Sequence, residues 1–575
     1  MFVSFNLVDQ PWLVVRPVGG GAPAEVSLWQ ALCEAHRFED LVVDLPTQKP
    51  ALLRQVLLPV VVRALGRPAT TREWAQWFAA GAFTPTQLEA ITAYLDAQRE
   101  WFDLFHEKHP FGQVAGLRTA KDETKGTAVL VATAATGNNV PLFSPRSDAD
   151  PLELTPAQAA RWLLHAHCWD TAAIKTGVVD DPKVKAGKTT GNPTGPLGQC
   201  GVIVPIGRTL FDTLLLNVPS GPALRSDDLP QWERRTPETP AELSVASSVW
   251  HTREARGLLD IWTWQSRRIR LIPESTPNGT RVTRVVLAAG DRLTATPDVE
   301  PHTAWNLTPA GKTKGKSGTA LPRRPRRHPQ GKAAWRGLEA LLATDREDRA
   351  ATTTKSGFAT SVLVNELRAR RELLDADYPV QLELLGMVYG TQSSTFEDLY
   401  YDTIPLPLTA LNIDSEVPGA LLEMAAQAEG LAQAVNNLAN DLRRAAGADP
   451  IPWDKGHRPG ELVLHALDPL MRRAMIGMRT VDDDVDMLER GLLAWEQKAD
   501  DITRRIGDRV IKAAAPTAVF AGRTIEQDDG KERTFRQSTA EANFGNRIEQ
   551  ILTRVHSVPG RLAALDSDQE KATQR

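Results

Sequence analysis

The sequence predicts an α+β protein, with a mixed α/β N-terminal domain containing long loops and a C-terminal four-helix bundle. Strand and helix patterns alternate irregularly up to about residue 401, whereas apolar residues recur every three or four positions after residue 402. The length of 575 residues exceeds that of one ordinary domain. We therefore expect an N-terminal domain at residues 1–401 and a helical bundle at 402–575.

The first hundred residues mix strand and helix signals. Residues 2–15 are rich in β-branched and aromatic side chains, which favour a strand. Ser27 is a suitable cap for an amphipathic helix at 28–35. Residues 51–65 form an apolar segment that predicts a buried helix, interrupted at Pro59. A further helix is expected at residues 88–105, with a core of Ala90, Leu95, Trp101, Phe102 and Phe105.

The middle of the N-terminal domain alternates long loops with regular segments. Thr155 and Pro156 predict the start of a helix that extends to residue 173. Residues 177–201 hold six glycines and three prolines, and a loop of that length in a compact domain is usually functional or disordered. Residues 202–217 and 244–300 read as strand-rich.

The C-terminal part shows helical periodicity. Met424, Ala428, Leu431, Val435, Leu438 and Leu442 follow helical spacing, as do Leu488, Leu492, Trp495, Ala499, Ile502 and Ile506. Ser538 and Glu541 match a capping box that would open another helix, with Phe544, Ile548, Ile551 and Val555 on its apolar face. Residues 462–478 are a candidate for a further helix.

Composition indicates a folded cytoplasmic protein. The hydrophobic content is 42%, the charged content 24% and the net charge −4, so the whole chain is not a general DNA-binding polycation. No apolar run is long enough to span a membrane, and the first residues lack the basic region of a signal peptide. Cys33, Cys168 and Cys200 form no disulfide or zinc pattern, which suits a reducing compartment.

The motifs that would indicate an enzyme fail on spacing. Three Gly-Lys-Ser/Thr tripeptides, beginning at Gly187, Gly311 and Gly315, lack the earlier glycine of a phosphate-binding loop. His165, His167, Cys168 and Asp170 lie on different faces of one helix, so structural histidines are favoured over a metal site. The acids at 482–486 precede a periodic segment and complement a helix dipole. We therefore predict no catalytic residue, no metal and no cofactor.

A strongly basic segment spans residues 311–336. It contains nine Lys or Arg and no acid, and its glycines and prolines predict a flexible loop. The segment is equally compatible with a solvated surface loop and with a loop that contacts phosphates, where each neutralised phosphate releases counterions.

A small polar turn interrupts an apolar region near the end of the N-terminal domain. Residues 382–389 resemble a strand, Gly390 to Ser394 form a polar tip, and an aromatic-rich segment follows from Phe396 to Tyr401. The pattern fits a hairpin or a strand-to-helix turn, and by itself it indicates no function.

Six phrases in series resemble one family, the CasA large subunit of the type I-E CRISPR surveillance complex Cascade. They are 7–13 (LVDQPWL), His109-Pro110-Phe111 with Gln113, Leu142-Phe143, 207–217 (GRTLFDTLLLN), 264–268 (WQSRR) and 390–393 (GTQS). The phrases occur in the expected order and extend over nearly the whole chain.

The resemblance implies a non-catalytic cytoplasmic subunit of a crRNA-guided antiviral complex. Such a subunit recognises the protospacer-adjacent motif in double-stranded DNA, wedges the duplex open to start R-loop formation, and serves as a landing site for a helicase–nuclease. Its expected partners are target DNA, the crRNA-containing Cascade subunits and that helicase–nuclease, with no membrane. Minor-groove edges are degenerate, which suits tolerance of several motif sequences.

The resemblance also assigns residues. Gln392 corresponds to the wedge, with Thr391 and Ser393 beside it in the motif-reading hairpin. A glycine loop that contacts the motif corresponds to Gly187, Lys188 and Gly191, because glycine lets the backbone approach a base edge.

Three further expectations follow from the resemblance. Arg292 is the nearest cation to the family's minor-groove lysine and is expected to contact DNA. Lys312, Lys314 and Lys316 are expected to follow the DNA backbone. A loop with Asn139, Leu142 and Phe143 is expected to dock into the rest of the complex, and the cysteine cluster of some relatives is absent near Leu271.

Two other classes of function remain open. A structural assembly factor of a nucleoprotein complex would show no dependence on the motif. A metal-dependent nuclease, using the acids near Asp482, would cleave DNA in the presence of Mg²⁺.

Overall fold

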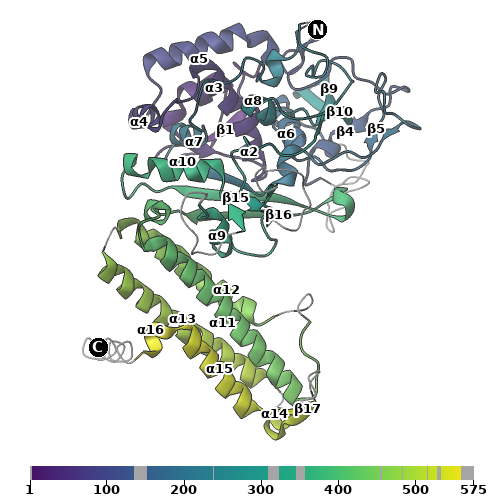
Figure 1. Ribbon diagram of the computed structural model, residues 1–575. Coiled ribbons are helices and arrows are strands. Elements are labelled where there is room, and N and C mark those ends of the chain that lie inside the picture. Colours follow the sequence, from purple (N-terminus) through teal and green to yellow (C-terminus); the bar gives the residue numbers. More distant parts are fainter. Residues whose placement is uncertain are drawn as a thin grey trace, which may run out of the picture. The chain divides into compact units, whose positions relative to one another are not determined.

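The computed structural model describes residues 3–134, 152–236, 238–307, 323–344, 357–452, 456, 458–481, 484–514, 516–526 and 532–557. The chain divides into two compact units. The first contains Met1–Ala334, Ala343–Leu374 and Pro379–Thr403, and the second contains Trp335–Leu342, Asp375–Tyr378 and Ile404–Arg575. The first unit mixes helices with small sheets, and long helices dominate the second (Figure 1). The predicted α+β class is confirmed, whereas the boundary after residue 401 stays a prediction.

The first unit surrounds its apolar core with short helices and strands. Its helices are α1 (Leu28–Cys33), α2 (Gln48–Leu52), α3 (Leu58–Leu65), α4 (Thr71–Ala79), α5 (Pro85–Ala97), α6 (Pro156–Trp169), α7 (Leu210–Leu216), α8 (Leu258–Trp262) and α10 (Val362–Arg370). Its strands are β1 (Leu13–Pro17), β2 (Ala24–Val26), β3 (Phe38–Leu41), β4 (Lys125–Gly126), β5 (Lys175–Thr176), β6 (Lys188–Thr189), β7 (Val202–Ile206), β8 (Thr252–Arg253), β9 (Arg267–Thr276), β10 (Gly279–Ala289), β11 (Arg292–Leu293), β12 (Trp305–Leu307), β13 (Arg323–Pro325), β14 (Phe358–Ala359) and β15 (Gln381–Tyr389), with β16 (Phe396–Pro405) leading out of the unit.

The sheets of the first unit are small and mostly antiparallel. Two of them matter for the site, with strand orders β16-β15-β7 and β5-β6, and a third, β4-β10-β9, is built on the long β9–β10 hairpin. Strand β15 pairs with β7 from Gln381↔Ile206 to Leu385↔Val202. All five residues of β7 are buried, so this sheet anchors β15 in the core.

Several local predictions for the first unit are confirmed. Ser27 caps α1 through a capping box with Gln30, and Thr155 caps α6 through one with Gln158. The buried helix at 51–65 is interrupted as expected, because a π-helical turn over Leu53–Leu57 precedes Pro59. A proline clashes with the preceding turn of an α-helix, and a wider turn accommodates it.

Other predictions for the first unit are wrong in detail. Helix α6 ends at Trp169 rather than at residue 173, and the next helix along, α7, occupies residues expected to be strand. Thr209 caps α7 by accepting a hydrogen bond from the Asp212 N–H, and this local signal outweighs the apolar run. In the helix expected at 88–105, α5 ends at Ala97, and of the expected core only Leu95 and Phe102 are fully buried.

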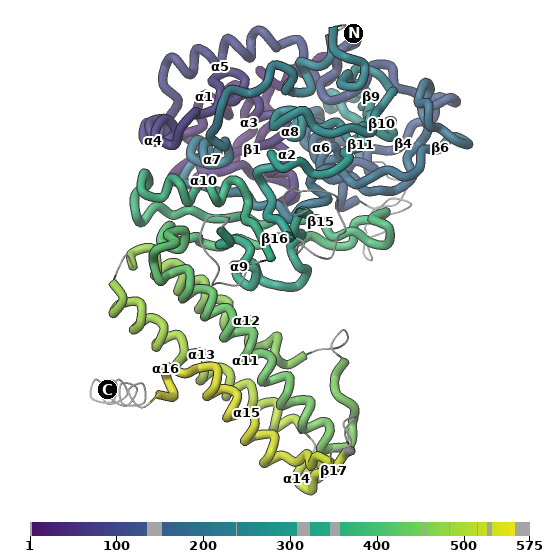
Figure 2. Tube along the Cα trace, viewed as in Figure 1, coloured from purple at the N-terminus to yellow at the C-terminus, as the bar shows by residue number. Residues whose placement is uncertain are grey.

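The second unit is built on long helices (Figure 2). Its elements are α9 (Leu338–Leu341), α11 (Val417–Ala445), α12 (Gly460–Gly477), α13 (Val485–Ala513), α14 (Pro516–Ala521), β17 (Arg523–Glu526), β18 (Glu532–Phe535), α15 (Gln537–Ile551) and α16 (Thr553–His556). Helix α11 packs against α12, α13 and α15, and α12 also packs against α13. All the apolar residues predicted to face the core from α11 are buried.

Two features of the second unit differ from expectation. The capping box at Ser538 is wrong: α15 begins at Gln537, and its N-cap is Arg536 without a side-chain cap. The antiparallel β17–β18 hairpin was not expected, because its strands are short and largely polar. By contrast, Asp484 is the N-cap of α13 and accepts from the Met487 N–H at 2.9 Å, and Asp486 lies in the first turn, as expected for acids that complement a helix dipole.

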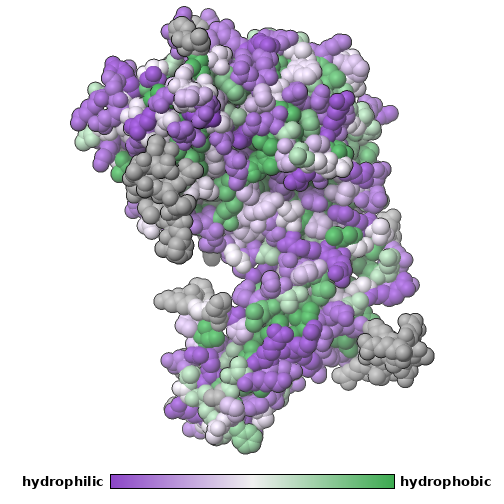
Figure 3. Space-filling model, turned by 180° about the vertical axis from the view of Figure 1, so that it is seen from behind, coloured by the Kyte–Doolittle hydropathy of each residue, from purple (hydrophilic) through white to green (hydrophobic). Residues whose placement is uncertain are grey.

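The described surface is mixed in hydropathy (Figure 3), and the three cysteines are unpaired. On the face in Figure 3, hydrophobic residues form patches among hydrophilic ones. Cys33, Cys168 and Cys200 are free and buried. Within the described part of the chain, no helix is both long enough and apolar enough to cross a membrane.

Candidate nucleic-acid interface

Strands β15 and β16 form a hairpin whose polar tip is Gly390 to Ser394. The tip is closed by backbone hydrogen bonds, from the Gly390 N–H to the Thr395 carbonyl at 3.0 Å and from the Ser393 N–H to the Gly390 carbonyl at 2.8 Å. The Ser394 N–H also donates to the Thr391 carbonyl at 3.2 Å. Of the two alternatives left open by the sequence, the hairpin is therefore correct.

Two residues of the tip hold a backbone conformation that L-amino acids rarely adopt. Gln392 has φ +55° and Ser393 has φ +54°, both in the left-handed region. The Gln392 side chain is exposed and has no hydrogen-bond partner among the described residues. Strain that the surroundings maintain at an exposed polar residue is a reason to suspect a functional role.

The tip and the end of β15 are anchored by the last residue of α6 and by the segment that follows it. The Ala172 N–H donates to the Ser393 carbonyl at 2.7 Å, and the Tyr389 hydroxyl donates to the Trp169 carbonyl at 2.6 Å. Burial raises the pKa of the Tyr389 hydroxyl well above its ordinary value, so it acts as a hydrogen-bond donor at neutral pH. A Cβ on Gly198 would lie 2.3 Å from that hydroxyl oxygen, so this glycine makes room for the contact.

Residues 170–176, which we call the connector, are fixed by a buried ion cluster. The Asp170 carboxylate pairs with the Arg267 guanidinium and, at 2.7 Å, with the Lys175 ammonium. Burial alone would raise the pKa of Asp170, but these two cations outweigh it and hold that pKa below its ordinary value. Arg267 also donates to the carbonyls of Thr171 at 2.7 Å and Pro193 at 2.8 Å.

The connector also supports the glycine loop through strand pairing. Strand β5, inside the connector, pairs with β6 in the register Lys175↔Thr189. Beyond it, Lys185 and Lys188 exchange backbone hydrogen bonds at 2.9 and 3.1 Å. Ala186 and Gly187 between them have φ +48° and +71°, as in a two-residue hairpin turn with left-handed central residues. The Lys188 ammonium is exposed, with no ion pair among the described residues.

The third predicted element, Arg292, lies against the same loop. Its Nη2 donates to the Thr190 carbonyl at 2.6 Å, and its Nη1 would lie 3.6 Å from a Cβ on Gly191. The guanidinium carbon is 4.1 Å from the centroid of the buried Trp250 ring, and the Lys183 ammonium lies at the same distance from that centroid. Arg292 therefore binds the loop itself, and its contact with DNA stays a prediction.

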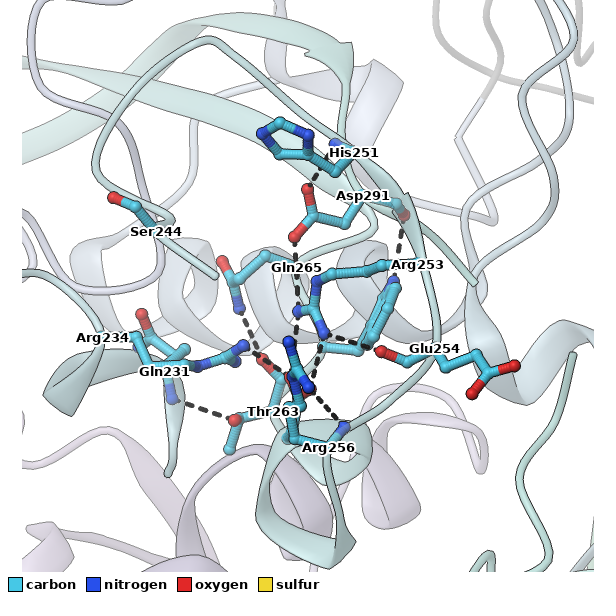
Figure 4. A network of polar contacts seen from close by, with 12 residues as sticks. Gln231, Arg234, Ser244, His251, Arg253, Glu254, Arg256, Thr263, Gln265 and Asp291 are labelled. Atoms are coloured by element: carbon cyan, nitrogen blue, oxygen red, sulfur yellow. Dashed lines mark hydrogen bonds and ion pairs between the residues drawn. The ribbon is translucent and has the colours of Figure 1, made fainter. Parts of the chain in front are cut away.

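A buried polar network lies next to Arg292 in the chain, and Figure 4 shows its members His251, Arg253 and Asp291. The neighbouring Asp291 carboxylate accepts from Arg268 at 2.9 Å and from the His251 N–H at 3.1 Å, and it lies 3.5 Å from Arg253. The Arg292 N–H in turn donates to the His251 carbonyl at 2.8 Å. The phrase at 264–268 thus has a structural role: Arg267 holds the connector and Arg268 holds the start of β11.

Some predicted residues cannot be placed. Lys312, Lys314 and Lys316, and likewise Asn139, Leu142 and Phe143, lie outside the described residues. The connector links the two predicted regions: it bonds Ser393 of the tip and pairs through β5 with β6, which holds Lys188 and precedes the segment bound by Arg292.

The histidines near the connector are packed in the interior. His165 Nε2 lies 2.9 Å from Thr47 Oγ1, and His167 Nε2 lies 2.9 Å from the Gly112 carbonyl. Burial lowers the pKa of each imidazole to about 3. Among the residues that the structure describes, no group of three or more His, Cys, Asp or Glu could hold a metal ion.

The connector and its ion cluster were missed from the sequence. In the sequence, Arg267 belongs to the phrase at 264–268 and has no assigned role, and Asp170 suggests only a metal ligand. A helix rich in Ala, Leu and Trp that is followed by Asp170 and Lys175 is only a weak sign of a buried ion pair. No local pattern links residue 170 to residue 267 or residue 172 to residue 393.

Comparison with known proteins identifies the family. The model of the family "CRISPR-associated protein Cse1" matches residues 6–506. "CRISPR-associated protein CasA/Cse1" of Thermus thermophilus is 28% identical over 554 residues, which cover 92% of this chain and 99% of that protein. The chain belongs to the Cse1 family, and the resemblance to CasA is confirmed.

Solved structures share the fold. Cse1 of Thermobifida fusca superposes with a TM-score of 0.78 at 30% identity, and Cse1 of Acidimicrobium ferrooxidans with 0.76 at 29%; in each case 96% of this chain and 98% of that chain are covered. A chain described as "CRISPR RNA-guided surveillance complex" matches with a TM-score of 0.65 at 21% identity, over 88% of this chain and 99% of its own length. At that identity the match shows the fold alone.

Proposed function

We propose that this protein is the large subunit of a type I-E crRNA-guided surveillance complex and acts without catalysis. It recognises the protospacer-adjacent motif in double-stranded DNA, separates the first base pair to start R-loop formation, and provides a landing site for a helicase–nuclease. Membership of the Cse1 family supports the assignment to such a complex. The shared fold of a chain described as "CRISPR RNA-guided surveillance complex" agrees with it.

The observation that carries the proposal is the contrast within the β15–β16 hairpin. Its exposed Gln392 is unpartnered among the described residues and held in a strained conformation, while the connector fixes the neighbouring Ser393 and Tyr389 fixes the end of β15. A wedge needs a tip that can make new contacts and a base that does not yield when the duplex pushes back. Flipping or unpairing a base costs a few kcal/mol, which contacts with the DNA must offset while a rigid support keeps the wedge in position.

The glycine loop supplies the second half of the proposed interface. The exposed Lys188 ammonium can neutralise a phosphate, and the exposed backbone at Gly187 can approach a groove edge. Arg292, bound to Thr190 and Trp250, keeps the loop in shape. Lys312, Lys314 and Lys316 would add contacts to the DNA backbone.

The proposal is tested by assembling the complex with and without this chain. Binding is measured on two targets that match the guide equally, one with the proper motif and one with a scrambled motif. With the chain present, the proper motif should bind more tightly; without it, binding should weaken and the difference between the two targets should vanish. Unchanged discrimination without the chain would favour a structural assembly factor. Cleavage of DNA by the purified chain with Mg²⁺ would contradict a non-catalytic role.

A further inference from the structure

A second polar site lies in the helical unit, apart from the hairpin and the glycine loop. A pocket of about 440 Å³ opens between α11, β18 and the first turns of α15. Its lining includes four guanidinium groups and one carboxylate, from Arg444, Arg533, Arg536, Arg547 and Asp441. We call it the arginine pocket. Counting four positive charges against one negative gives a formal charge of +3.

The single carboxylate is shared by two of the arginines. Asp441 Oδ1 accepts from Arg444 at 3.2 Å, and Asp441 Oδ2 lies 3.8 Å from Arg547. Arg533 has no carboxylate partner among the described residues, and Arg536 donates to the Thr539 hydroxyl at 3.2 Å. Like charges gathered in one pocket repel each other, so the lining favours an anion in their midst.

The start of a helix adds a second observation. Arg547 Nη1 makes no hydrogen bond among the described residues, and its carboxylate neighbour, Asp441 Oδ2, is 3.8 Å away. Helix α15, with 15 residues, starts at the pocket, where Thr539 and Ala540 contribute to the lining. Its N-cap, Arg536, provides no side-chain cap, so the first N–H groups and the positive end of the helix dipole are left for an external acceptor.

We infer that the arginine pocket binds a phosphate-bearing anion. Guanidinium groups match the oxygens of a phosphate in pairs, and a helix N-terminus is a common binding site for such groups. The cavity is larger than a single phosphate needs and leaves room for the group that carries it. The phosphate can be free in solution or part of a nucleic-acid strand, because the same chemistry recognises both.

The test uses the full-length protein and two variants that each lose one positive charge. Arg533→Gln changes an exposed pocket residue that has no carboxylate partner among the described residues, so the fold should be retained. Arg490→Gln is the matched control. Arg490 follows Glu489, whose carboxylate pairs with Arg554 at 2.9 Å, and Arg554 comes after the end of α15 that is opposite to the pocket. Calorimetry at constant ionic strength then compares inorganic phosphate with a short single-stranded oligonucleotide.

Arg533→Gln should weaken binding about tenfold or more, while Arg490→Gln should bind as the unchanged protein does. An Arg533-dependent loss with inorganic phosphate indicates a free anion as ligand, and a loss confined to the oligonucleotide indicates a strand phosphate. Absence of binding by both probes would overturn the inference, as would equal effects of the two substitutions. Neither result depends on Gln392 or on recognition of the motif, so the proposed function stands or falls separately.

Discussion

The first unit places two exposed turn tips on a deeply buried support, and the two regions differ in almost every physical respect. The tips carry Gln392 and Lys188, whose side chains are exposed and have no partners among the described residues. The support holds Asp170 between Arg267 and Lys175, all three nearly inaccessible to solvent. Loss of a partner is therefore costly in the support, and the groups available for new contacts lie in the tips.

This difference teaches how the protein separates stability from recognition. A buried charge that loses its partner is costly, whereas an exposed polar side chain contributes little to folding. Substitutions in the support should therefore change the free energy of unfolding and move both tips together. Substitutions at the tips should leave that free energy nearly unchanged and affect only the interaction with DNA.

The largest effect is expected from Asp170→Asn. The substitution leaves Arg267 and Lys175 buried without their carboxylate, which should lower the free energy of unfolding by about 3–5 kcal/mol. Denaturant titration measures it. Asp227→Asn is the matched control, because the exposed Arg225–Asp227 pair is worth about 0–1 kcal/mol. A comparable loss in both variants would mean that the connector is not a special support.

A smaller effect is expected from pH. Burial lowers the pKa of His165 and His167 to about 3, from about 6.5 in the unfolded chain. Below pH 6.5 the unfolded chain binds protons that the folded chain does not, so stability falls as the pH falls from 6.5 toward 3. Between pH 7.5 and 5.5 each histidine should cost about 1.4 kcal/mol.

Urea unfolding at the two pH values tests this expectation. Both histidines lie on α6, which leads directly into the connector, so acid should weaken the support and not the tips. Equal free energies of unfolding at pH 7.5 and 5.5 would show that the histidines are not held neutral in the folded chain.

The smallest effect on stability is expected at the tip. Glycine adopts a φ of +55° without strain, so Gln392→Gly should relieve the turn while the unfolded chain gains entropy. The net change should be within about 1 kcal/mol and should not be a large loss. Thermal unfolding measures this change in stability. Gly187→Ala is the reverse kind of substitution, because it replaces a glycine by a residue with a Cβ at φ +71°. A loss of several kcal/mol in Gln392→Gly would place this residue in the support.

The parts of the fold set by neighbouring residues could be predicted from sequence. Ser27 and Thr155 cap the helices they were expected to cap, and the periodic apolar residues of α11 are buried. Local rules failed where two signals competed. The apolar run 210–216 suits a strand or a buried helix, and Thr209 decides for the helix.

The candidate site was predictable only in pieces. The polar tip and the glycine-rich segment are visible in the sequence, and the family resemblance gave them roles. The contacts that join them, from Ala172 to Ser393 and from Arg292 to Thr190, connect positions far apart in the chain. Such contacts follow from packing, and no local periodicity encodes them.

The central claim is that Gln392 opens the duplex, and one comparison tests it most directly. In the assembled complex, R-loop formation is measured on an intact target and on a target already melted beside the motif. Gln392→Ala should slow the reaction on the intact duplex and have much less effect on the melted one. Gln381→Ala, at the exposed far end of β15, is the control and should change neither. If Gln392→Ala slows R-loop formation equally on both targets, the role of Gln392 as a wedge is contradicted.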